Sequence, residues 1–213
     1  MSAVAEFTEL ARLADADPAC PASPPGVILI GASTGGPGIL ANLLRNIDPA
    51  TRWPIVIAQH MPDTFTDSLA RRLNTLCPLP VREVHTRLPL VGGQVYIARG
   101  GHDITMRRAG GGVWLHSEDA AARYLWHPSV DHLVESAMGL FDAQRLVGIL
   151  LSGMGNDGAA TMAELKKEGG RTVAESKDSA VVFGMPKELI ERGGASEVRC
   201  ANDIPQLLQR WLG

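Results

Sequence analysis

The sequence lacks the features that mark several large classes of protein. Only three cysteines occur, Cys20, Cys77 and Cys200, widely spaced and without a CxxC pair. This predicts free thiols in a reducing compartment rather than a disulfide framework or a zinc site. The net charge of −3 lacks the basic bias of nucleic-acid-binding proteins. No apolar run approaches the roughly 20 residues needed to cross a bilayer, and the acidic N-terminus does not resemble a signal peptide. These absences predict a cytoplasmic protein that neither inserts into a membrane nor binds nucleic acid.

The first 25 residues differ in composition from the rest of the chain. They are rich in alanine and end in the proline-rich stretch PACPASPPG, which neither a helix nor a central strand accommodates. We therefore expect residues 1–25 to form an arm or linker and residues 26–213 to form one domain. A domain of that length can bury its own core.

Apolar runs alternate with amphipathic stretches along residues 26–213. VILIGA (27–32), WPIVIAQH (53–60) and RLVGILLSG (145–153) are typical of buried parallel strands, and stretches with apolar residues at helical spacing follow them. A further helix is predicted to begin at Pro128, with Ser129 near its cap. From Val81 to Leu115, short β-type runs separated by GG, RGG and AGGG indicate hairpins. The pattern predicts an α/β fold: a doubly wound, mostly parallel sheet with helices on both faces and a β-hairpin insertion.

The residues that follow the three apolar strands supply a hydroxyl, an imidazole and a carboxylate. Ser33 follows the first strand, His60 ends the second, and Asp157 lies in the glycine-rich turn after the third. Ligands of open α/β sheets bind beyond the carboxyl ends of the strands. Each residue alone has a commoner structural role, for example as a helix cap. Together they are the set needed for nucleophilic acyl transfer, in which the imidazole takes the serine proton and the carboxylate orients the imidazole.

The glycine-rich turn GASTGGPG leaves a second interpretation open. Gly35 and Gly36 allow a sharp turn from strand to helix with free N–H groups, which could bind either an oxyanion or a pyrophosphate. The register of the dinucleotide motif G-x-G-x-x-G does not fit, and no GK[ST] sequence occurs. The second strand ends in His60, where a nucleotide site would have a ribose-binding acid. These differences favour hydrolysis over nucleotide binding.

The motifs GASTGGP, QHMP and GMGNDGA occur in this order and resemble the catalytic domain of the CheB-type protein-glutamate methylesterases of chemotaxis. The resemblance covers nearly all of residues 27–200. It implies that Ser33 is the nucleophile, His60 the general base and then acid, and Asp157 the orienting carboxylate. It also implies that oxyanion and substrate are bound near Thr34, Gly35, Met154 and Asn156.

The family resemblance also implies an activity and its partners. The substrates would be γ-glutamyl methyl esters on the cytoplasmic helices of chemoreceptors, with methanol as product, and the family commonly deamidates selected receptor glutamines as well. Neither a metal nor an organic cofactor is expected. CheB proteins typically carry an N-terminal receiver domain, in whose place residues 1–25 stand. We therefore expect regulation to be absent or to come from a separate receiver or chemosensory signalling protein.

Two further points concern alternatives and the remaining histidines. An inactive paralogue acting as a chemosensory scaffold is a second hypothesis, against which the intact Ser33, His60 and Asp157 argue.

His127 stands before PSVD, where the family often has a basic residue that contacts the substrate groove. The other histidines show no paired ligand spacing and are expected to be surface or structural residues: His85, His102, His116 and His132.

Overall fold

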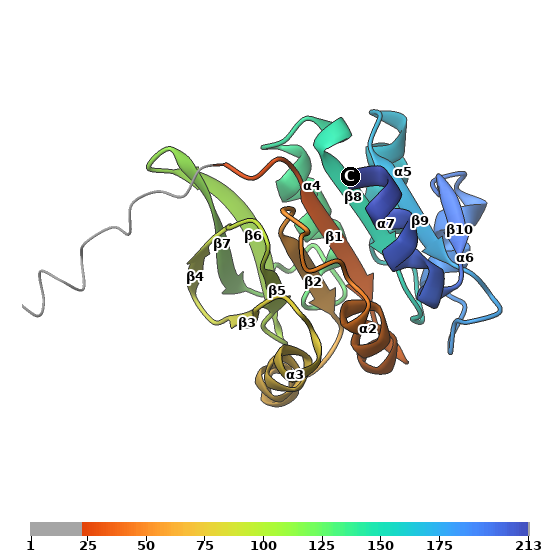
Figure 1. Cartoon of the computed structure of the whole chain (residues 1–213), viewed down its shortest axis with the longest axis horizontal. Helices are drawn as coiled ribbons and strands as arrows, with labels where there is room; N and C mark the ends of the chain where they lie inside the picture. Colours follow the sequence, from red (N-terminus) through yellow and green to blue (C-terminus); the bar gives the residue numbers. More distant parts are fainter. Residues whose placement is uncertain (1–22, 213) are drawn as a thin grey trace, which may run out of the picture.

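A computed structural model describes residues 23–212 of the chain (Figure 1). Seven strands of this part form one sheet in the order β10-β9-β8-β1-β2-β5-β3, and neighbours in it pair in parallel. They are β1 (Val27–Ala32), β2 (Ile55–Gln59), β3 (Val81–Val84), β5 (Val95–Ala98), β8 (Leu146–Leu150), β9 (Arg171–Glu175) and β10 (Glu197–Arg199). Strand order reverses between β1 and β8, which is where open α/β sheets place their ligands.

Helices cover both faces of the sheet because alternate residues of each buried strand point to opposite sides. Ile28 and Ile30 of β1 pack in one core with α2, α3 and α7, whereas Val27 and Leu29 pack in the other with α4, α5 and α6 (Figure 1). The helices are α2 (Gly36–Arg45), α3 (Asp63–Leu76), α4 (Val130–Met138), α5 (Ala159–Lys167), α6 (Met185–Glu191) and α7 (Ile204–Leu212), with single 3-10 turns at η1 (Ala143–Arg145) and η2 (Ala201–Asp203). No helix in residues 23–212 is long and apolar enough to span a bilayer.

A small antiparallel sheet forms the hairpin insertion. It contains β4 (Arg87–Pro89), β6 (His102–Ala109) and β7 (Gly112–Asp119) in the order β4-β7-β6. In Figure 1 it lies beside β3 and β5, at the end of the molecule opposite β10. The predicted doubly wound sheet with a hairpin insertion is thus confirmed. However, β3 and β5, which lie in the region expected to form hairpins, belong to the parallel sheet, because the fully buried β5 pairs with β2.

The predicted arm falls almost entirely on residues 1–22, which lie outside the described residues, as does Cys20. The end of the arm contacts the domain, since the guanidinium of Arg145 donates to the carbonyls of Pro24 and Pro25, at 2.6 and 2.7 Å. Cys77 and Cys200 are free thiols. The division into an arm and one catalytic domain stays a prediction.

Candidate active site

The carboxyl ends of β1, β2 and β8 lie level with one another. The register sets Ala32 opposite Gln59 in β2, and Gly31 opposite Leu150 in β8. Backbone hydrogen bonds continue past the strand ends, from the N–H of Ser33 to the carbonyl of Ser152 (2.9 Å) and from the N–H of His60 to the carbonyl of Ala32 (2.9 Å). The parallel sheet therefore brings the segments that carry Ser33, His60 and Asp157 to one edge.

Gln59 supports the turn that carries Ser33. Its buried side chain donates from Nε2 to the carbonyls of Ser33 (2.9 Å) and His60 (3.0 Å). A Cβ on Gly36 would lie 2.0 Å from Oε1 of Gln59, and one on Gly35 would lie 2.6 Å from Val181. Close packing of the turn thus requires glycine at both positions, and this requirement does not depend on a bound phosphate.

His60 and Asp157 form a buried pair. His60 Nε2 lies 2.8 Å from Asp157 Oδ2, and the two side chains are 9% and 3% exposed. A carboxylate only accepts hydrogen bonds, so Nε2 carries the proton and Nδ1 keeps a free lone pair. Nδ1 is buried and has no hydrogen-bond partner within residues 23–212. The ring is therefore held in the tautomer that leaves Nδ1 able to accept a proton.

The N-terminus of α4 holds the carboxylate of Asp157. Its oxygens accept hydrogen bonds from the N–H groups of Val130 (2.7 Å) and Asp131 (3.0 Å) and from the hydroxyl of Ser129 (3.2 Å). Burial raises the pKa of Asp157, but the hydrogen bonds from His60 and from these two N–H groups outweigh it and leave the pKa below its ordinary value. Asp157 is therefore ionised at neutral pH. Its role as cap of its own helix is not observed, since α5 begins after Gly158 without a side-chain cap.

Asp103 in turn holds the segment before α4, and the sequence pattern does not point to it. The N–H of Ser129 (2.9 Å) and His127 Nδ1 (3.0 Å) bond to Asp103 Oδ1, and the N–H of Ala121 (2.9 Å) bonds to Oδ2. Ser129 is the N-cap of α4, as expected, and accepts from the N–H of His132. His127 is thus bonded within the protein through Nδ1, so only the rest of its ring can meet a substrate. Asp103 supports Asp157 by fixing the start of α4.

Trp126 is a second residue that the sequence pattern does not indicate. Its ring stacks on that of His60, with centroids 5.9 Å apart and planes 5° from parallel. A Cβ on Gly155 would lie 2.7 Å from the Trp126 ring, and Gly155 has a φ of 91°. Glycine at 155 therefore allows Trp126 to lie against the turn that carries Asp157, and Trp126 restricts rotation of His60.

Two serines end neighbouring strands, and their surroundings differ. Ser152 is fully buried; its hydroxyl donates to the carbonyl of Thr34 (2.7 Å) and accepts from the N–H of Val182 (2.8 Å), while its own N–H donates to Glu175 (2.7 Å). Ser152 is thus engaged in holding strand ends together. Ser33 is only half-buried, which is compatible with the nucleophile role predicted for it.

The turn after β8 packs directly against Ser33. A Cβ on Gly153 would lie 2.7 Å from the Cβ of Ser33, so only glycine permits this approach. Met154, which follows, is 72% exposed. The residues predicted to surround the oxyanion and substrate therefore flank Ser33 and Asp157 along the chain on this edge of the sheet: Thr34, Gly35, Met154 and Asn156. Which of their N–H groups bind the oxyanion stays a prediction.

Comparison with known proteins gives concordant matches. Residues 28–208 match the family model described as CheB methylesterase. The chain is 49% identical over 187 residues to "Protein-glutamate methylesterase/protein-glutamine glutaminase 3" of Rhodospirillum rubrum, covering 88% of this chain and 50% of the relative. It is 45% identical to a similarly named protein of Rhodopseudomonas palustris, covering 88% and 51%. The chain thus spans about half the length of these relatives. The crystal structure of the Thermotoga maritima CheB methylesterase catalytic domain matches with a TM-score of 0.83 and 36% identity, over 87% of this chain and 97% of that one.

Proposed function

This chain belongs to the CheB methylesterase family, and we propose that it is a serine hydrolase that demethylates glutamate γ-methyl esters on chemoreceptors. The observation that carries the proposal is the buried pair of His60 and Asp157, with Nε2 and Oδ2 2.8 Å apart, on the sheet edge where Ser33 also lies. The names of the relatives, protein-glutamate methylesterase/protein-glutamine glutaminase, support this substrate class. Because such esters lie on the cytoplasmic helices of receptors, the proposed place of action is the cytoplasm.

In the proposed mechanism the Ser33 hydroxyl attacks the γ-carbonyl carbon of the methylated glutamate while His60 Nδ1 takes its proton. The resulting oxyanion is stabilised by backbone N–H groups of the two glycine-rich turns. As the tetrahedral intermediate collapses, the C–O bond to the methoxy group breaks and His60 returns the proton, which releases methanol. Asp157 stays ionised and stabilises the imidazolium that exists between these two transfers.

Water completes the proposed cycle. His60 Nδ1 takes a proton from water as the water oxygen attacks the ester carbonyl on Ser33. The second intermediate then collapses with cleavage of the bond between the acyl carbon and Ser33 Oγ, and His60 returns the proton to that oxygen, which leaves a glutamate side chain and free Ser33. A glutamine substrate passes through the same acyl-enzyme, with ammonia leaving in place of methanol. One set of residues therefore supports both the proposed demethylation and a deamidation of receptor glutamines.

The direct test of the activity is methanol release from receptor-containing membranes that carry isotopically labelled methyl esters on glutamate. The proposal predicts release of labelled methanol that rises with enzyme concentration, together with loss of label from the receptor. No release under conditions where the protein is folded would contradict the methylesterase assignment. Tight binding of a nucleotide without ester hydrolysis would instead support the nucleotide-binding interpretation of GASTGGPG.

A further inference from the structure

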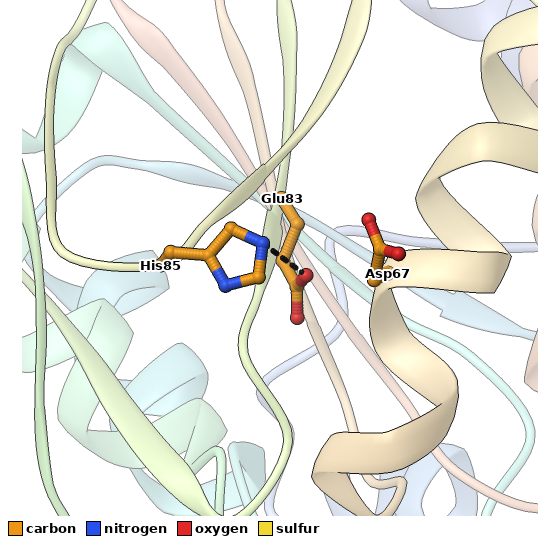
Figure 2. Close-up of side chains that lie close together, drawn as sticks. All are labelled: Asp67, Glu83 and His85. Carbon is orange, nitrogen blue, oxygen red and sulfur yellow. Dashed lines mark ion pairs between the residues drawn. The ribbon is translucent and has the colours of Figure 1, made fainter.

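Three potential metal ligands converge at the edge strand of the main sheet. One donor atom each from Asp67, Glu83 and His85 lies within 4.8 Å of the other two. Asp67 is on α3, Glu83 is on the edge strand β3, and His85 follows that strand by one residue. Figure 2 shows the His85 ring facing the Glu83 carboxylate, with Asp67 close by on the neighbouring helix. His85, expected to be a surface or structural histidine without ligand spacing, follows Glu83 by two residues and meets Asp67 only through the packing of α3 on β3.

The carboxylate of Glu83 is the strongest sign that these side chains form a site. Its side chain is 97% buried, being 3% exposed, and its Oε2 has no hydrogen-bond partner within the described residues. Oε2 lies 3.0 Å from His85 Nε2, an ion pair only when that imidazole is protonated, and the approach lacks the direction of a hydrogen bond. Beside a neutral His85 ring this buried carboxylate oxygen has neither an ion pair nor a hydrogen bond, which is costly, and a cation bound between the two groups would satisfy it.

The other oxygen of Glu83 is fixed by the fold. Oε1 accepts a hydrogen bond from the hydroxyl of Thr66 at 2.5 Å, and Thr66 Oγ1 in turn accepts the N–H of Gly100 at 3.1 Å. Outer contacts of this kind orient metal-ligating carboxylates and keep the free oxygen directed at the ion. Glu83 is therefore held with Oε2 facing His85 and Asp67.

We propose that Asp67, Glu83 and His85 bind a divalent transition-metal cation, for which Zn²⁺ is the probe. One imidazole nitrogen and two carboxylate oxygens suit zinc and its first-row neighbours, whereas Mg²⁺ and Ca²⁺ prefer oxygen donors alone. Metal–ligand bonds of about 2.0–2.2 Å require the donor atoms to draw together. The His85 and Asp67 side chains can do so, because they are 59% and 42% exposed. Water would complete the coordination from the adjoining pocket of about 310 Å³.

Arg71 competes with the proposed cation. It lies four residues after Asp67 on α3, and its guanidinium pairs with the Asp67 carboxylate. The Arg71 side chain is 79% exposed, so it can turn into solvent when a cation takes its place. Removal of the Arg71 side chain is therefore expected to tighten metal binding.

The test is a zinc titration of the metal-free 213-residue chain at neutral pH, in competition with a chromophoric chelator. Wild type is expected to bind one equivalent. His85→Gln and Asp67→Asn are expected to weaken binding more than ~10-fold, since loss of a residue that merely supports a ligand already costs about that much. Arg71→Ala is expected to bind more tightly. His102→Gln, a histidine outside the cluster, is the matched control and is expected to bind as wild type does.

Two measurements locate the ion and separate it from the proposed catalytic residues. Crystals grown with zinc should show an anomalous peak between Asp67, Glu83 and His85, and zinc should raise the unfolding temperature of wild type but not of His85→Gln. Stoichiometric binding that survives His85→Gln, or that is lost in His60→Gln, would overturn the proposal, as would the absence of binding by wild type. None of these readouts depends on ester hydrolysis, so a failure of the zinc proposal and a failure of the proposed esterase activity can be distinguished.

Discussion

Replacement of Asp157 by asparagine separates the chemical role of this residue from its structural one. The carboxylate accepts hydrogen bonds from His60, Ser129, Val130 and Asp131, with donor–acceptor distances from 2.7 to 3.2 Å. Asparagine keeps the shape but has a single acceptor oxygen. Whichever way its amide faces, its NH₂ group meets the N–H of either Val130 or Asp131. The variant therefore loses both a negative charge and one backbone hydrogen bond.

The two losses have different magnitudes. A buried backbone N–H left without a partner costs about 1–3 kcal/mol, which is the expected fall in the free energy of unfolding. The charge matters more for catalysis, because Asp157 stabilises the His60 imidazolium. With Nε2 and Oδ2 2.8 Å apart, the charge centres are roughly 4 Å apart, and their attraction is about 4 kcal/mol at an effective dielectric constant near 20. This predicts a fall in kcat of about 10³-fold.

The assay is methanol release by Asp157→Asn at a temperature where the variant is folded, together with denaturant unfolding to measure its stability. Asp131→Asn is the matched control. Its carboxylate accepts from the hydroxyl of Thr161 and, within residues 23–212, makes no hydrogen bond or ion pair with His60, so its kcat should change little. If Asp157→Asn loses stability but keeps the kcat of wild type, Asp157 only braces the start of α4, and the mechanism proposed above is wrong.

Two further predictions concern residues around this pair. Trp126→Ala removes a stack on His60 that is worth about 0.5–1.5 kcal/mol, so kcat should fall about 2- to 10-fold. The control is Leu125→Ala, at a neighbouring residue that is 77% exposed. Equal kcat in the two variants would contradict the role of Trp126 in positioning His60. Burial raises the pKa of Asp103, but the hydrogen bonds it accepts leave that pKa below its ordinary value. Its contribution to stability is therefore present above the ordinary pKa of 3.8 and is lost as pH falls through the lowered value. The free energy of unfolding, measured from pH 7 to pH 2, should accordingly be lower for Asp103→Asn than for wild type at pH 7, and should change less with pH below about 4. An equal dependence on pH in the two proteins would contradict the stabilising role of the Asp103 carboxylate.

The features that sequence predicts well are those in which neighbours along the chain determine the structure. VILIGA is a buried run that ends in a glycine-rich turn, so both the strand and the exposed end that carries Ser33 follow from local pattern. The placement of the segments that carry Ser33, His60 and Asp157 at one edge of the sheet needs only one further rule, namely that the carboxyl ends of parallel strands meet there. By contrast, β5 is short and flanked by glycines. These local signals are typical of hairpins and do not reveal that it pairs with β2.

The unpredicted features depend on contacts between residues far apart in sequence. Trp126 lies 66 positions from His60, and its stacking arises from the path of the segment before α4. Asp157 precedes α5, where local pattern favours a cap, yet its oxygens serve the N-terminus of α4 instead. The cluster around Glu83 likewise requires α3 to pack on β3 before its members meet. The spacing of residues along the sequence does not indicate these tertiary contacts.

The most direct test of the central claim is methanol release by Ser33→Ala from labelled receptor membranes, at an enzyme concentration where wild type removes the label to completion. Ser68→Ala, in an exposed turn of α3, controls for loss of a serine hydroxyl and should act as wild type does. We expect Ser33→Ala to stay folded, to keep the His60–Asp157 pair and to release methanol no faster than a sample without enzyme. Release by Ser33→Ala at the rate of wild type would show that Ser33 is not the nucleophile.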